Sequence, residues 1–147
     1  MKTISYAITV HNEIDELTKL LNFLQLHIRK EDEIVIQYDE SSATDEVKEY
    51  LTLMNSMHEN HKVCRFPLNK DFASFKNNLK LHCSKDYIFQ VDADEIPHEY
   101  LVEYLGEVLE TNPVDIVFVP RVNTVEGLEQ SHIDKWKWNV NDKGWVN

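Results

Sequence analysis

The feature of this sequence that most constrains its fold is a regular alternation of short apolar runs and amphipathic segments. Ile4 to Val10 is a mostly apolar, β-rich run with little alternation, which is typical of a strand covered on both faces in a parallel sheet. From Ile14 to Ile28 the apolar residues recur at helical spacing, with charged residues between them. The chain therefore begins with a strand, a short polar loop and an amphipathic helix.

The same βα unit recurs along the chain. Successive units of this kind imply a parallel sheet with right-handed crossovers, so we expect an α/β domain over residues 1–120. Residues 121–147 are polar, have no clear period and contain all three tryptophans. The further predicted elements are strands at Glu33 to Tyr38, Lys62 to Phe66, Tyr87 to Val91 and Asp115 to Pro120, and helices at Asp45 to Met57, Phe72 to His82 and Glu99 to Leu109.

Charge and composition exclude several classes of function. The 26 acidic and 15 basic residues give a formal net charge of -11, which repels nucleic acid phosphates, and no basic patch is visible. The two cysteines form no CxxC pair, so we expect free thiols and neither a zinc site nor a disulfide framework. No signal peptide and no apolar run of about 18 residues is present, so we expect a cytoplasmic protein with no integral membrane segment.

Acidic residues gather where a buried strand is predicted to end. In open parallel sheets ligands bind outside the carboxyl ends of the strands, where the loops converge. Three carboxylates, of Asp92, Asp94 and Glu95, follow the predicted strand at Tyr87 to Val91. Such oxygens are the ligands that Mg²⁺ or Mn²⁺ prefers, often together with substrate phosphates. The alternative is a solvated acidic turn that caps the next helix.

Glycine-rich phosphate loops are absent from the sequence. The chain has only three glycines, and none follows an early strand. A dinucleotide fingerprint and a P-loop are therefore excluded. Any phosphate must be held by a metal, by helix N-termini or by a single cation such as Lys76.

Four segments follow one another in a characteristic order: Ala7 to Glu13, Asp39 to Asp45, Asn69 to Ala73 with Lys76 and Asn77, and Tyr87 to Glu95. Together they resemble the motifs of glycosyltransferase family 2. The resemblance covers roughly residues 3 to 120 and implies a GT-A fold, a Rossmann-like three-layer α/β/α sandwich with a mostly parallel sheet. It also implies a nucleotide-diphosphate-sugar donor, with a UDP-sugar favoured.

The resemblance assigns roles to residues of the first two loops. The backbone around Val10 and His11 would cradle the nucleotide, and Glu13 would lie near the base or ribose. Asp39 would accept a hydrogen bond from a pyrimidine ring, its alternative being a helix-capping or surface aspartate. Ala93, which lies between Asp92 and Asp94 in the fourth segment, would also contact the nucleotide.

The remaining two segments would hold the diphosphate and the cation. Asp71 and Lys76 match the part of the family that borders the base and the diphosphate, where glycine and arginine are more usual. Asp92 would contact the ribose or a metal-bound water, and Asp94 would ligate a divalent cation, Mn²⁺ or Mg²⁺. Glu95 would add a contact near the metal or cap the following helix.

The resemblance implies transfer of a sugar to an acceptor hydroxyl, mostly with inversion, and the acceptor is a sugar or a lipid-linked molecule of unknown identity. Family members continue further with an acceptor-binding half, so residues 121–147 are expected to be the start of a truncated or absent acceptor region. Two alternatives stay open: a catalytically incomplete nucleotide-sugar-binding module and a metal-dependent nucleotidyltransferase.

The catalytic base is not identified by the resemblance. Asp134 and Glu129 are the candidates in the tail, in a chain where surface acids are common. The tryptophans of the tail, Trp136, Trp138 and Trp145, are expected to pack against a core or sheet edge, with a sugar-stacking platform as the alternative.

Overall fold

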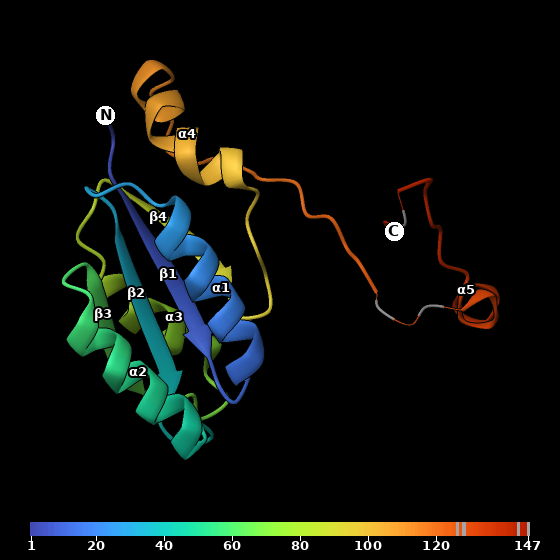
Figure 1. Ribbon diagram of the computed structural model, residues 1–147, viewed down its shortest axis with the longest axis horizontal. Coiled ribbons are helices and arrows are strands. Elements are labelled where there is room, and N and C mark those ends of the chain that lie inside the picture. Colours follow the sequence, from blue (N-terminus) through green and yellow to red (C-terminus); the bar gives the residue numbers. More distant parts are fainter. Residues whose placement is uncertain (126, 128, 144, 147) are drawn as a thin grey trace. The chain divides into compact units, whose positions relative to one another are not determined.

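The computed structural model describes residues 1–125, 127, 129–143, 145 and 146. The chain divides into two compact units, Met1–Pro113 and Val114–Asn147. The first unit contains β1 (Ile4–Val10), α1 (Ile14–His27), β2 (Glu33–Asp39), α2 (Asp45–Met57), β3 (His61–Phe66), α3 (Phe72–Leu81), β4 (Tyr87–Asp92) and α4 (Glu99–Thr111) (Figure 1). The second contains α5 (Gln130–Trp136).

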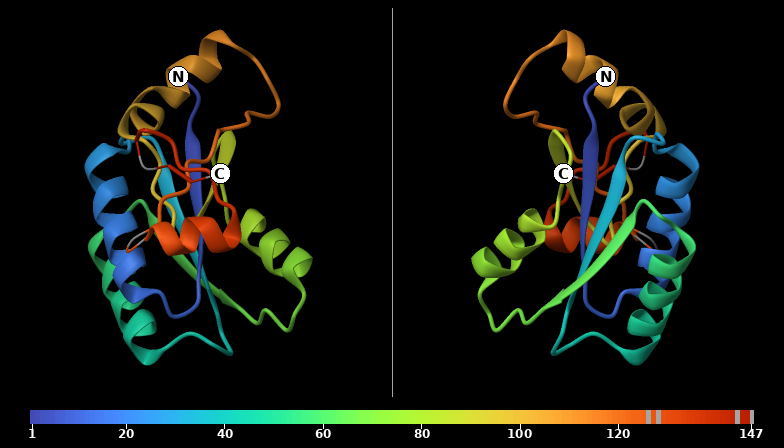
Figure 2. Two further views of the ribbon diagram at one scale, coloured as in Figure 1. Left: turned by 90° about the vertical axis from the view of Figure 1, so that its right-hand side faces the viewer. Right: turned by 90° about the vertical axis from the view of Figure 1, so that its left-hand side faces the viewer.

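The four strands form one parallel sheet in the order β3-β2-β1-β4. The chain moves outward from β1 to β3 and then crosses back to place β4 on the other side of β1. Because such crossovers are right-handed, the change of direction puts α3 on the face opposite α1 and α2. Figure 2 shows these two layers of helices on either side of the sheet. The predicted α/β class and parallel sheet are confirmed.

The two faces of the sheet carry unequal cores. One face packs β1 and β2 against α1, α2 and α4 and contains most of the buried apolar side chains. The other face, toward α3, is smaller and centres on Ala7, Val35 and Leu79. Since β1 and β2 are covered on both sides, apolar and polar residues do not alternate along them. This confirms the prediction made for Ile4 to Val10.

Buried carboxylates hold the amino-terminal ends of the strands together. The Glu33 carboxylate accepts hydrogen bonds from Ser5 Oγ (2.7 Å), from the Ser84 backbone N–H (2.7 Å) and from Ser84 Oγ (2.9 Å). Lys62 Nζ lies 2.8 Å from Glu33 Oε2. Burial favours a higher pKa for Glu33, but these partners outweigh it and lower the pKa to about 2. Glu33 thus links β1, β2, β3 and the entrance to β4.

The strand predicted at Asp115 to Pro120 is not formed, so that prediction was wrong. The apolar, β-branched residues of this segment give it strand propensity, but a strand exists only where a neighbouring backbone pairs with it. Among the described residues the sheet ends at β4, and 115–120 has no regular secondary structure.

Helix α5 was not predicted, because it has no buried stripe to produce a period. At its start the Glu129 backbone N–H donates to His132 Nδ1 (3.2 Å), a local contact that favours a helix N-terminus. Across the described residues, no helix combines the length and the apolar character that crossing a membrane requires.

The Glu33 network predicts a pH-dependent contribution to stability. We expect Glu33→Gln to lower the free energy of unfolding at pH 7 by about 1–3 kcal/mol, because the charged hydrogen bonds and the Lys62 pair are lost. The folded-state pKa is lowered, so the contribution is present above pH 4.5 and is lost as pH falls toward 2. Urea unfolding across this range measures it. Glu49→Gln, an exposed change on α2, is the control, and equal loss in both variants would contradict the prediction.

Candidate functional site

A pocket of about 300 Å³ lies at the carboxyl ends of β1 and β4. These two strands are where the strand order reverses, and ligands of open α/β sheets bind at such a point. Predicted residues and three unpredicted ones, Thr9, Phe72 and Phe75, contribute to it. The lining residues are Thr9, His11, Glu13, Phe72, Phe75, Lys76, Asp92, Ala93 and Asp94.

The three unpredicted residues had a weak signal in the sequence. Thr9 is a polar residue near the end of a buried apolar strand. Phe72, Phe75 and Lys76 recur at helical spacing at the start of α3, so one face of that helix turns toward the pocket. Lys76 was recognised on this face by its charge, whereas the two aromatic residues resembled ordinary core positions.

The first loop is organised by its own acidic residue. Glu13 Oε2 accepts the backbone N–H groups of His11 (2.8 Å) and Asn12 (3.2 Å). The His11 ring lies nearly parallel to the Phe75 ring, with centroids 6.3 Å apart and an interplanar angle of 11°. Its Nδ1 is 3.1 Å from Ser42 Oγ. His11 and Phe75 thus form an aromatic wall of the pocket, while the Val10 side chain is buried in the core.

Asp39 joins two loops of the site. Its carboxylate is 4% exposed and accepts hydrogen bonds from Ser41, Ser42 Oγ (2.6 Å) and the Leu68 backbone N–H (3.0 Å). Burial favours a raised pKa, but these donors outweigh it and hold the pKa of Asp39 well below its usual range. The carboxylate is therefore ionised and fixes the loop after β2 to the loop after β3. Its contact with a base stays a prediction.

At the end of β4, one carboxylate forms a closed polar triangle. Asp92 Oδ1 accepts Thr9 Oγ1 (3.1 Å) and lies 3.2 Å from Lys76 Nζ, which is itself 3.3 Å from Thr9 Oγ1. The Asp92 backbone N–H donates to Glu95 Oε2 (3.1 Å) and so holds the turn. Asp94 is exposed on the same turn.

The donor set of the pocket suits a divalent cation shared with a ligand. Asp92 and Asp94 bring exposed carboxylates to the same pocket, and such hard oxygens suit Mg²⁺ or Mn²⁺. In the part of the chain that the structure describes, no three His, Cys, Asp or Glu side chains converge as a metal cage. The residues therefore fit a cation completed by phosphate oxygens, which is how Mg²⁺ is usually bound.

Asp71 does not line this pocket. It is the N-cap of α3, where its Oδ1 accepts the Ser74 backbone N–H at 3.0 Å and its Oδ2 accepts Ser74 Oγ at 2.7 Å. Asp71 therefore fixes the start of the helix that carries Phe75 and Lys76.

The two candidate bases belong to the second unit. Asp134 Oδ1 accepts Gln130 Nε2 at 2.9 Å along α5, and Glu129 precedes that helix. In the same unit Trp136 stacks with His132 (5.2 Å between centroids) and contacts Trp138 (5.1 Å). The assignment of a base, and the choice between packing and sugar stacking for the tryptophans, stay predictions.

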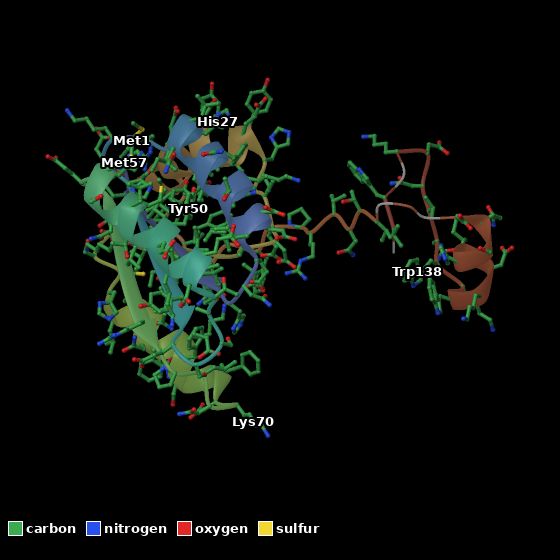
Figure 3. All side chains as sticks on the ribbon, turned by 60° about the horizontal axis from the view of Figure 1, so that its bottom comes forward. Met1, His27, Tyr50, Met57, Lys70 and Trp138 are labelled. Atoms are coloured by element: carbon green, nitrogen blue, oxygen red, sulfur yellow. The ribbon has the colours of Figure 1, made fainter. Side chains whose placement is uncertain are left out.

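The loop between β3 and α3 has a strained backbone. Asn69 and Lys70 have φ angles of 46° and 59°, in the left-handed region that costs non-glycine residues energy. Figure 3 shows Lys70 at the outer end of this loop, with its side chain directed into solvent. The loop leads directly into Asp71 and the helix that borders the pocket, so the strain is located beside the site.

Relief of this strain can be measured. We expect Lys70→Gly to raise the free energy of unfolding by about 0.5–1 kcal/mol, because glycine adopts a positive φ without a Cβ clash. Chemical denaturation of the two proteins measures the difference. Lys48→Gly near the start of α2 is the opposite control and is expected to destabilise, because glycine has a low helix propensity. A destabilised Lys70→Gly protein would contradict the assigned strain.

Comparison with known proteins adds two findings. Residues 5–144 match the family model described as "Glycosyl transferase family 2". The fold is similar to the crystal structure of S. aureus TarS 1-349, with a TM-score of 0.65 and 19% identity over 82% of this chain and 39% of that one. At this identity the likeness concerns the fold, and the chain spans well under half of that structure. No significant match was found among curated proteins.

Proposed function

Because the chain belongs to glycosyl transferase family 2, we propose that the pocket between the ends of β1 and β4 binds a nucleotide-diphosphate sugar with a divalent cation, for transfer of the sugar to an acceptor hydroxyl. One observation carries the proposal. The pocket lies where the strand order reverses and combines two exposed carboxylates, Asp92 and Asp94, with one lysine, Lys76. This is a donor set for a cation and for the anion that accompanies it.

The walls of the pocket suit the parts of a nucleotide. His11 and Phe75 offer flat aromatic surfaces against which a planar base can pack. Lys76 and the amino-terminal end of α3, which carries partial positive charge, attract the diphosphate. A UDP-sugar is the donor we favour. Asp39 would lie beside its base, because the Asp39 carboxylate accepts a hydrogen bond from Ser42 Oγ and Ser42 Oγ in turn contacts the His11 ring.

Asp92 and Asp94 would hold the Mn²⁺ or Mg²⁺ ion, with phosphate oxygens completing its coordination. A bound cation of this kind neutralises the negative charge that develops on a departing diphosphate. Asp92 is positioned for this by Thr9 and by the turn that Glu95 holds. Glu95, the third carboxylate predicted for the metal, is not among the residues that line the described pocket, and it would act near the ion by holding the turn through the Asp92 backbone N–H.

Transfer also requires a group that removes the proton of the acceptor hydroxyl. Asp134 and Glu129 are the proposed candidates, with attack from the face opposite the diphosphate and inversion of the sugar. Both lie in the second unit, whereas the described pocket lies in the first. A module that binds the donor without completing transfer is the alternative proposal. The family assignment favours either function over nucleotidyl transfer.

The proposal predicts that Asp94 supports ligand binding and not folding. A thermal-shift screen with UDP-, GDP-, CMP- and dTDP-sugars, each with and without Mn²⁺, first identifies the donor, because a ligand of the folded state raises Tm. We then expect Asp94→Ala to weaken Mn²⁺-dependent binding of that donor by about tenfold or more in titration calorimetry. The Tm of the ligand-free protein should stay unchanged, since the side chain is exposed.

Glu31→Ala is the matched control, because it removes an exposed carboxylate from the loop before β2, at the opposite end of the sheet. It should leave donor binding unchanged. Mn²⁺-dependent binding of equal strength in folded Asp94→Ala would rule out the metal role of this residue. A screen in which no nucleotide sugar raises Tm would rule out the proposed function.

A further inference from the structure

We propose that Lys76 is the resident counter-ion of the acidic pocket, and that it couples uptake of a divalent cation to binding of a phosphate-bearing ligand. In the free protein the Lys76 ammonium group pairs with Asp92 Oδ1, an oxygen that a bound cation would use. A nucleoside diphosphate draws Lys76 onto its phosphates and releases that oxygen. This inference rests on the proposed function and concerns the order of events in the same pocket.

The contacts of Lys76 place its charge on the acidic motif. Its ammonium group is 3.2 Å from Asp92 Oδ1 and 3.3 Å from Thr9 Oγ1, while Thr9 Oγ1 donates to the same Asp92 oxygen at 3.1 Å. The three groups come from α3, β1 and β4, so the fold itself brings them together. One of the two carboxylate oxygens of Asp92, Oδ1, is therefore already paired with a cation.

The position of Lys76 among the pocket's charges predicts that a cation alone binds weakly. Among the described residues that line it, Lys76 is the one with a permanent positive charge, and the carboxylates are those of Glu13, Asp92 and Asp94. A divalent ion at Asp92 would lie beside the ammonium group, where like charges repel. No three described side chains form a metal cage that compensates for this repulsion.

The pair is also weak enough to be exchanged. Lys76 and Asp92 side chains are 34% and 53% exposed, so water screens their attraction. Lysine carries a compact charge on a flexible stem and can move from a carboxylate to a nearby phosphate. A diphosphate then satisfies Lys76 and the cation together, and each ligand strengthens the binding of the other by the same factor.

The test compares Lys76→Gln with Lys80→Gln. Lys80 lies one turn further along α3, is exposed and lies outside the pocket, so its loss changes net charge equally. The fraction of free Mn²⁺, measured by electron paramagnetic resonance without nucleotide, gives the affinity for the ion alone. We expect Lys76→Gln to bind Mn²⁺ about two- to fivefold more tightly than the wild-type chain and the control, the range expected for a partly exposed pair.

Two further variants locate the effect. Lys76→Arg keeps the charge and should bind Mn²⁺ alone as weakly as the wild-type chain. In the Asp92→Asn background the gain from Lys76→Gln should disappear, because the oxygen in question no longer carries charge. Thermal unfolding of each variant confirms that the compared proteins are folded.

UDP supplies the second arm of the experiment. In the wild-type chain UDP should raise Mn²⁺ affinity more than it does in Lys76→Gln, where the counter-ion is already absent. A Lys76→Gln protein that binds Mn²⁺ no better than Lys80→Gln, or a gain that persists with Asp92→Asn, overturns the inference.

The inference and the proposed function fail in different ways. Wild-type binding of UDP with Mn²⁺, combined with no gain in Lys76→Gln, would refute the counter-ion role alone. A gain in Lys76→Gln, combined with a wild-type chain that binds no nucleotide sugar, would refute the proposed function and the coupling to a phosphate ligand.

Discussion

The structure depends on the parallel pairing of β1 with β2 on one side and with β4 on the other. This pairing reverses the direction in which strands are added, sends α3 to the opposite face and leaves the loops after β1 and β4 next to each other. The pocket, the closed triangle of Thr9, Lys76 and Asp92, and the aromatic wall all lie at this reversal.

Carboxylates at the two ends of the sheet have opposite physical states. At the amino-terminal ends Glu33 is buried, accepts hydrogen bonds from protein donors and stabilises the fold. At the carboxyl-terminal ends Asp92 and Asp94 are exposed, and Asp92 is paired with a partly exposed lysine, Lys76. Asp39 is intermediate: it lies at the functional end but is buried and shapes the loops. Stability and ligand binding are thus assigned to separate ends of the same strands, which allows the exposed acids to vary at little cost in folding.

Helices and strands could be predicted where their own residues determine them. The site could be predicted only where its residues directly follow a predicted strand. Buried strands and amphipathic helices of the first unit follow from their own residues, so their bounds agree with expectation within about two residues. The strand predicted at 115–120 was wrong, because strand formation depends on pairing with another part of the chain that the local sequence does not reveal. The acidic turn after β4 was found from sequence because it follows a strand directly. Two contacts could not be predicted from the sequence, because they join residues far apart in the chain that only the fold brings together. These are the hydrogen bond from the Leu68 backbone N–H to Asp39 and the contact of Lys76 with Asp92.

The central claim is that a nucleoside diphosphate and a divalent cation bind together at the ends of β1 and β4. Backbone amide NMR of the 147-residue chain, with UDP and substoichiometric Mn²⁺, locates a bound paramagnetic ion directly. The account predicts that the amide signals broadened first belong to the turns around His11 and Asp92 to Glu95, while those of Glu33 and Lys62 at the other end stay sharp, and that the same Mn²⁺ without UDP broadens far less. Broadening centred elsewhere, or broadening that does not depend on UDP, would contradict the account.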